Sequence, residues 1–474
     1  MIKKCLAVLC LLLFSALIYV EVAPAEIKAD YGGSLRLRQE YWENVVDFET
    51  TKKPDRDFFR LRTSLWGKVD FSKDLGLYGR LTNEARYYLG NYKPFEITAP
   101  PAAALTSDDD RFDEDELIID NLYFDMKNLF GLPVDLRIGR QDFLGQFGEG
   151  FVILEGTPGD GSRSFYFNAA RATIRFNKDH SVDLIYVNNR QTDDFLPSLY
   201  PARSDYLAGY YKNKKLLNVS DERGFIIYGK NRISDYLSIE PYFIRKHEDS
   251  TGGYGKKFPG PKDNLRLNTL GMRAVFTAGN WKVRTEYARQ VGHYDDANDR
   301  DREAAGGYLF IGQKYADVPL KPEWEAGYVY LSGDKRNTRD HEGWNPLFSR
   351  APLWNEVMIY PLISETLGDG GAIPGYWTNL RLYKLGLKLA LAQKTNLALS
   401  YQYLRAVEKT TGLNPNMFSN DSKDRGHIGT FMLSHAFTKQ LDGYLQAEYF
   451  APGDFYGRKA DDAIFLRWQL QYKF

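Results

Sequence analysis

The feature that most constrains the fold is an alternation of apolar and polar side chains that outlasts an ordinary strand. From Phe59 to Phe71 the odd positions carry apolar or small uncharged residues, and the even positions are mostly charged or polar. A strand of a soluble sandwich usually has about five or six residues, whereas a tilted membrane-spanning strand needs about nine to eleven. The length and the period indicate a strand with one face in lipid and the other in water.

The same alternation recurs along the chain and predicts eighteen strands. A helical alternative is poor, because charges at every second position would interrupt an apolar stripe at 3.6-residue spacing. The predicted strands lie near 33–43, 58–71, 74–89, 117–127, 133–142, 168–177, 181–189, 222–231, 236–246, 266–277, 281–290, 306–315, 323–332, 376–390, 395–405, 426–437, 440–450 and 463–474.

The connections between these strands are alternately short and long. The short ones are 72–73, 128–132, 178–180, 232–235 and 278–280, and most of those between them are long. Outer-membrane barrels combine short periplasmic turns with long outer loops and an even strand number. We therefore expect an all-β protein, a transmembrane antiparallel barrel of about eighteen strands.

The first 25 residues have the pattern of a secretory signal. Two lysines precede the apolar run Cys5–Val20, and small residues follow at 23–25. Both cysteines, Cys5 and Cys10, fall in this segment, and Cys10 as a lipoprotein cysteine is the weaker alternative because no small residue precedes it. We expect residues 1–25 to be removed and residues 26–474 to form a single barrel domain.

The last strand ends in an alternating aromatic face. Phe474, Tyr472, Leu470 and Trp468 share that face. A terminal Phe on such a strand is similar to the assembly signal of bacterial outer-membrane proteins. We expect the protein in the outer membrane of a Gram-negative bacterium, in contact with its lipids and with the barrel assembly machinery.

Overall charge excludes one class of partner. The 62 basic residues equal the 62 acidic ones, whereas a nucleic-acid binder needs a basic excess to displace counterions from phosphates. No nucleic-acid partner is expected, and any selectivity must come from local charge.

Local charge is concentrated on the polar faces of the predicted strands. Ion pairs that merely stiffen the wall are one interpretation. A net-positive cluster that recruits anions is the other, since Arg matches planar carboxylates. The basic candidates are Arg36, Arg38, Arg60, Arg62, Arg80, Arg86, Arg137, Arg171, Arg175, Arg273 and Arg284, and the acidic ones include Glu40, Glu84, Asp125, Glu240, Glu286 and Glu448.

Several short segments resemble the alginate export family of eighteen-stranded outer-membrane barrels. They are Leu136–Gln141, Gly148–Gly150, Phe165 with Ala169–Arg171, Tyr330–Asp334, Asn345–Phe348, Ala447–Tyr449 and Pro452–Tyr456. The resemblance implies a monomer in which a polyanionic uronate polymer crosses a narrow Arg-lined pore, gated by an outer loop and a periplasmic turn. It adds Arg140 to Arg137 and Arg171 as pore-lining candidates.

Two departures from the family weaken the assignment to alginate itself. Residues 168–170 lack the acidic residue that usually precedes the position of Arg171, and Leu347–Trp354 is more apolar than a polyuronate gate suggests. We therefore expect a channel of the alginate-export type that passes an anionic polysaccharide or a related anionic solute. The alternative is a small-anion-selective or general diffusion porin.

Two long loops invite specific hypotheses. The acidic stretch Asp108–Glu116 offers oxygen ligands for Ca2+, but it lacks the spaced frame of a calcium loop, so a solvated acidic loop is the preferred interpretation. No cofactor is otherwise expected. The stretch Asp334–Tyr376 is far longer than usual loops and is rich in Trp and Pro, which predicts that it folds over or into the barrel mouth.

Other functional classes find little support. The six histidines have no metal-ligand spacing, and no Gly-x-Ser-x-Gly elbow occurs. An outer-membrane lipase or protease using Ser434 or Ser400 with His435 is one alternative, and a barrel that sheathes an electron-transfer protein is another. We do not expect an enzyme.

Overall fold

A computed structural model describes most of the chain. The described residues are 27–45, 48, 55–90, 111–153, 166–190, 192–197, 199, 215–217, 220–249, 263–295, 300–335, 337–349, 354–359, 378–409, 418–419 and 421–474. The proposed signal segment 1–25 lies outside them.

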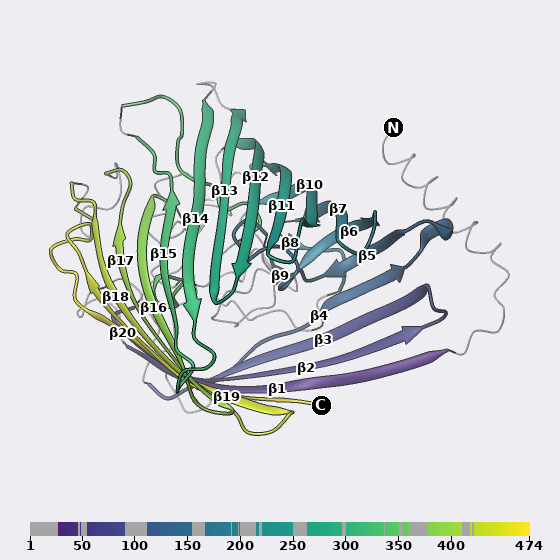
Figure 1. Cartoon of the computed structure of the whole chain (residues 1–474), viewed down its shortest axis with the longest axis horizontal. Helices are drawn as coiled ribbons and strands as arrows, with labels where there is room; N and C mark the ends of the chain where they lie inside the picture. Colours follow the sequence, from purple (N-terminus) through teal and green to yellow (C-terminus); the bar gives the residue numbers. More distant parts are fainter. Residues whose placement is uncertain are drawn as a thin grey trace.

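The chain forms a closed barrel of eighteen antiparallel strands, which confirms the predicted fold class. Each strand pairs with the next along the chain, and β20 returns to pair with β1 (Figure 1). The barrel strands are β1 (Lys28–Glu43), β2 (Arg56–Asp70), β3 (Leu75–Tyr88), β4 (Phe112–Met126), β5 (Val134–Gln141), β6 (Phe167–Arg175), β7 (His180–Asn189), β10 (Asp221–Arg232), β11 (Leu237–Asp249), β12 (Asn264–Ala278), β13 (Trp281–Asp295), β14 (Asp301–Lys314), β15 (Glu323–Leu331), β16 (Leu380–Ala392), β17 (Thr395–Arg405), β18 (Asp424–Ala436), β19 (Leu441–Pro452) and β20 (Ala463–Lys473).

The remaining elements are short and belong to connections. Two short strands of two residues each, β8 (Thr192–Asp193) and β9 (Lys215–Leu216), pair antiparallel in the connection between β7 and β10. Two single 3-10 turns are η2 (Leu129–Gly131) and η5 (Val357–Ile359). No helix among the described residues is long and apolar enough to cross a membrane.

The two faces of the strands divide as the alternation requires. On β2, Leu61 and Leu65 are 40% and 51% exposed, whereas Arg60 and Ser64 are buried. Large apolar side chains are exposed in the same way on most other strands. The outer face therefore presents the apolar surface that a lipid-facing barrel requires.

Some strands extend beyond their apolar alternation. β13 reaches Asp295 and β14 begins at Asp301, although their predicted bounds are 281–290 and 306–315. Backbone pairing continues there, with His293 opposite Asp301. Hydrogen bonding between strands does not need an apolar face, so the wall continues where the outward side chains become polar.

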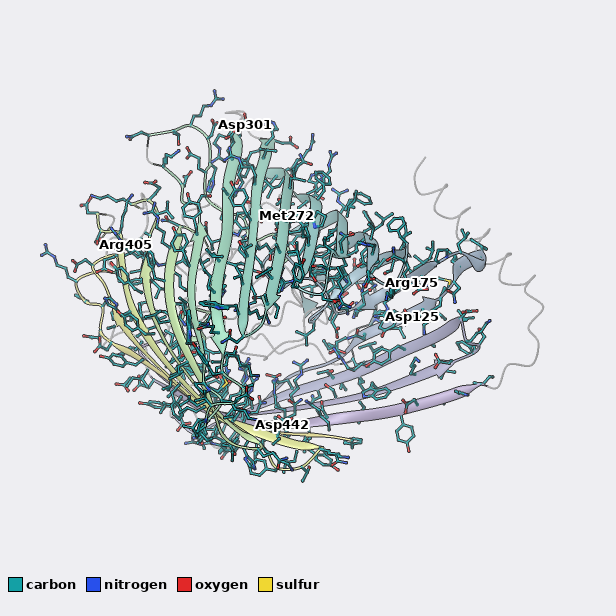
Figure 2. The ribbon with its side chains drawn as sticks, in the orientation of Figure 1. Asp125, Arg175, Met272, Asp301, Arg405 and Asp442 are labelled. Carbon is teal, nitrogen blue, oxygen red and sulfur yellow. The ribbon has the colours of Figure 1, made fainter. Side chains whose placement is uncertain are left out.

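The two ends of the barrel differ. Short turns such as 233–236 and 279–280 join strands at one end, and the connections 142–166 and 332–379 join them at the other. Figure 2 shows Asp301 and Arg405 at the long-loop ends of β14 and β17, and Asp125, Arg175 and Asp442 near the short-turn ends of β4, β6 and β19.

Candidate functional site

The inner wall at β1 and β2 carries four arginines in a compact block. Arg36 lies directly opposite Arg62 in the strand register, and Arg38 lies opposite Arg60. Like charges in directly opposed positions destabilise a sheet. We call these four residues the arginine block. Their mutual repulsion must be compensated by nearby carboxylates.

Two buried carboxylates lie within the arginine block. Glu40 is 3.1 Å from the guanidinium of Arg60, and Glu84 is 3.2 Å from Arg60 and 3.4 Å from both Arg36 and Arg62. Both carboxylates are fully buried. Arg62 also lies 3.7 Å from the buried carboxylate of Asp120 on β4, so three carboxylates lie among the four guanidiniums.

The other predicted basic residues mostly have a carboxylate partner of their own. Such pairs fit the interpretation that these arginines stiffen the wall, although Arg62 shares Asp120 (3.7 Å) and Lys230 shares Asp183 (3.1 Å). The partners are Asp120 for Arg80 (2.8 Å), Asp125 for Arg137 (2.6 Å), Asp193 for Arg140 (2.7 Å), Asp183 for Arg171 (2.8 Å) and Asp135 for Arg175, while Arg273 contacts Glu240 (2.9 Å), Arg284 contacts Glu325, and Arg86 lies opposite Arg60.

Two of the predicted lumen carboxylates have other roles than Arg pairing. Glu286 accepts hydrogen bonds from the hydroxyls of Tyr242 (2.9 Å) and Tyr308 (3.0 Å). Glu448 accepts the backbone N–H groups of Glu356 (2.8 Å) and Val357 (2.9 Å). The sequence gives no signal for these contacts, because one uses tyrosines on separate strands and the other uses a distant loop.

Two outer connections enter the barrel. We call residues 142–153 the inner loop, and residues 341–349 with 354–359 the strap. Phe151 of the inner loop stacks on Trp344 of the strap with ring centroids 5.2 Å apart, and the N–H of Phe348 donates to the carbonyl of Val152 (3.1 Å). All four side chains are at least 97% buried. The two segments therefore pack as one unit.

Glycines in the wall make room for the strap rings. A Cβ at Gly224 on β10 would lie 2.4 Å from the Phe348 ring, and one at Gly306 on β14 would lie 2.7 Å from the Trp344 ring. Any side chain at these positions would displace the strap.

Polar contacts fix the same part of the strap. Gln290 and Asn345 exchange two hydrogen bonds of 2.8 and 2.9 Å, and the ammonium of Lys246 donates to the carbonyl of Leu347 (2.8 Å). Lys246 is itself paired with two glutamates. Buried polar groups satisfied in this way specify one position of the segment.

The strap also contacts a wall far from β10. Asn355 donates to Gln402 on β17 (2.9 Å), and the carboxylate of Glu356 lies 2.8 Å from Arg467 on β20. Arg467 in turn lies 3.0 Å from Glu40 beside the arginine block. In an eighteen-strand barrel, β10 and β20 are ten strands apart one way and eight the other. The strap thus contacts opposite walls.

This arrangement explains the apolar character of Leu347–Trp354. Leu347 and Phe348 are 4% and 3% exposed because they pack against the inner loop and the wall. Their apolar character therefore reflects packing. Residues 336, 350–353 and 360–376 of the predicted mouth-covering stretch lie outside the described residues.

Glu149 joins the inner loop to arginines of β12 and β13. Its carboxylate lies 3.0 Å from Arg273 and also pairs with Arg284. Burial alone would raise the pKa of Glu149, but hydrogen bonds and charge from Arg284 and Arg273 outweigh it and lower the pKa.

The other predicted sites are placed as follows. Ser400 bonds Thr430 (2.7 Å), Ser434 donates to the carbonyl of Asn396 (3.5 Å), and His435 contacts Thr395 (2.8 Å), so neither serine is paired with this histidine. The acidic side chains of the stretch Asp108–Glu116, which offered ligands for Ca2+, lie outside the part of the chain that the structure describes. Among the described residues, no cluster of His, Cys, Asp or Glu is placed to hold a metal ion.

Several solved structures have a similar fold. The chain is similar to Pseudomonas aeruginosa OpdK with vanillate (TM-score 0.56, 11% identity, covering 94% of this chain and 98% of that one). It is also similar to P. aeruginosa OccK2 (OpdF) in complex with glucuronate (0.51, 11%, 94% and 98%) and to Acinetobacter baumannii OccAB1 (0.54, 12%, 96% and 99%). No curated protein matches by sequence.

An eighteen-stranded barrel with an apolar outer face and a charged lumen defines the class, an outer-membrane channel. Residues 211–468 match the family described as Alginate export, more than half of the 474 residues. The chain belongs to the alginate export family, as its short motifs indicated.

Proposed function

We propose that the channel passes an anionic polysaccharide or a related anionic solute along the arginine block. The observation that carries the proposal is the placement of four arginines in two directly opposed pairs on the inner wall at β1 and β2. Low-dielectric walls focus the field of such a cluster and raise the local concentration of anions. Arg also matches carboxylates in bidentate geometry.

A carboxylate beside the block supports this proposal. Glu356 of the strap lies against Arg467, which shares Glu40 with the arginine block. A carboxylate of the cargo would find arginine partners at the same level along the barrel axis. We infer that cargo and the strap compete for this wall, so that the strap constricts and gates the pore.

Passage of small carboxylates is the second candidate function. Two of the channels with a similar fold are described with vanillate and with glucuronate, both carboxylates. A small solute and a polymer would use the same arginines, so the two candidates differ in the size of the cargo. Comparing a monomeric uronate with its oligomers distinguishes them.

The test is ion selectivity in planar bilayers. Arg36→Gln with Arg62→Gln removes two charges from the block, and we expect anion-over-cation permeability to fall about two- to threefold. Arg171→Gln with Arg175→Gln is the matched control, because it removes two charges whose partners are Asp183 and Asp135. Unchanged reversal potentials in the first double variant, or an equal fall in the second, would contradict the assignment to the block.

A further inference from the structure

Three aromatic side chains and one arginine form a row across β2, β3, β4 and β5 near the short turns. The rings of Trp66 and Tyr78 are 6.0 Å apart at 22°, and those of Tyr78 and Tyr123 are 5.0 Å apart at 19°. The guanidinium of Arg137 lies 4.0 Å over the Tyr123 ring. We call these four residues the aromatic row.

Glycines flank the aromatic row at both ends. A Cβ at Gly32 on β1 would lie 2.6 Å from the Trp66 ring, so this ring occupies the space over the glycine. Gly139 lies opposite Tyr123 with φ +132°, which disfavours any other residue there. Gly32 therefore leaves room for the Trp66 ring, and Gly139 permits the backbone conformation opposite Tyr123.

The aromatic row lines a cavity of about 470 Å³ at the periplasmic mouth. Four acidic side chains and four basic ones also line the cavity, and Arg137 is one of the basic ones. Several of these charges pair with each other, as in Lys68 with Asp70 (2.7 Å) and Arg137 with Asp125 (2.6 Å). The cavity has no formal excess charge.

We propose that the aromatic row binds the sugar rings of a carbohydrate chain at the periplasmic mouth, before its charged groups reach the arginine block. The rings stack on one another and Arg137 covers Tyr123, so the row offers its apolar ring edges, against which the C–H faces of a pyranose can pack. Adjacent carboxylates and cations offer acceptors and donors to hydroxyls, which need both. This inference rests on the proposed function, and it narrows the cargo to a polysaccharide.

The position of the row favours a polymer over a single small solute. Trp66 and Arg62 share the inner face of β2 and are four residues apart, which corresponds to about 13 Å along the strand. A polymer can contact the ring and the arginine at once. A small solute would visit them in turn.

The test is blockage of single-channel current by sugars added on the periplasmic side of the full barrel. The probes are a neutral oligosaccharide, maltohexaose, and a uronic acid hexamer. Trp66→Leu and Tyr78→Leu should each shorten the residence time of both sugars by about three- to tenfold. Tyr78→Phe, which keeps the ring, should retain it.

Tyr444→Leu is the matched control. Tyr444 also faces the lumen in the short-turn half of β19, where its hydroxyl contacts Gln469 (3.3 Å) outside the aromatic row. Gln469 also accepts a hydrogen bond from Arg38 of the arginine block (2.6 Å), so Tyr444 serves as the control for the neutral sugar, and its loss should leave the residence time of maltohexaose unchanged. Arg36→Gln with Arg62→Gln should shorten the residence of the uronate alone.

The outcomes separate the two proposals. Unchanged residence times in both aromatic variants, with the arginine variant still affecting the uronate, would overturn the sugar site and leave the proposed function standing. No effect of the arginine variant on the uronate would instead contradict the proposed function. Where Trp66→Leu does not assemble, the comparison of Tyr78→Leu with Tyr78→Phe decides, since equal shortening in both would refute recognition of the ring.

Discussion

At the scale of single residues, a few ion pairs hold the strap and the inner loop against the barrel wall. Glu356 and Glu149 each join a loop to arginines of the barrel. Removing one partner of a buried ion pair leaves the other charge without its compensation, which costs about 3–5 kcal/mol in favourable cases. We therefore expect the positions of these two loops to depend on the charge of Glu356 and Glu149.

Neutralising Glu356 should loosen the strap. Glu356→Gln removes the carboxylate from Arg467, although Glu40 still partners that arginine, so the barrel itself should remain assembled. We expect more frequent current transitions in single-channel recordings. Asp442→Asn is the control, because its carboxylate is about half exposed and lies 3.5 Å from Lys473 near a short turn. A Glu356→Gln channel as quiet as the wild type would show that this pair does not hold the strap.

The pKa of Glu149 predicts the response to acid. A carboxyl whose pKa is lowered on folding contributes stability above its unfolded value, here near 4.5, and loses it as the pH falls through the folded value. Conductance should therefore stay constant from neutral pH to about 4.5 and rise only in stronger acid. Glu149→Gln should show the raised conductance at neutral pH, whereas Asp235→Asn in an exposed turn should not. Wild-type conductance in Glu149→Gln at neutral pH would refute this role.

At the scale of elements, the strap and the inner loop act as one packed unit against the wall. Phe151, Trp344 and Phe348 pack together, and two strand glycines accommodate the strap rings. A pore of eighteen strands without such a unit would enclose a wide aqueous channel. The strap is thus the element that distinguishes a narrow pore from an open one.

Removing the strap should widen the pore. Deletion of residues 340–370 should raise conductance and sensitise cells to bulky antibiotics. Gly224→Ala tests the same element by a smaller change, because its Cβ would clash with Phe348, whereas a Cβ at Gly429 would meet nothing within 4 Å. Gly429→Ala is therefore the control for conductance. If the deletion leaves both conductance and antibiotic sensitivity as in the wild type, the strap is only a surface feature.

At the scale of the whole molecule, the barrel depends on closure between its two ends. β1 pairs with β20, and Phe474 extends this pairing by exchanging backbone hydrogen bonds of 2.9 and 3.0 Å with Gly33. Closure gives each of the eighteen described barrel strands a neighbour on both sides. The last residue therefore completes the seam.

Replacing the terminal aromatic residue should hinder membrane assembly. Phe474→Ser keeps the backbone bonds but removes a ring that is 58% exposed and stacks near Tyr472. We expect less heat-modifiable barrel in outer-membrane fractions. Phe437→Ser is the control, because it removes an exposed aromatic ring in the short turn between β18 and β19, and it should assemble normally. Equal yields from the two variants would contradict a special role for Phe474.

The sequence by itself determined the strands, their faces and the class of fold. A period of two assigns each side chain to lipid or lumen without knowledge of any partner, so Arg60 and Leu61 could be placed on opposite faces from their positions alone. The resemblance in short motifs also identified the family. Only the tertiary structure decided which charges meet, because strand register places Arg38 opposite Arg60 and Arg36 opposite Arg62. It also brought Glu356 to Arg467, 111 positions away, since a contact between a loop and a strand depends on how the barrel closes and not on local spacing.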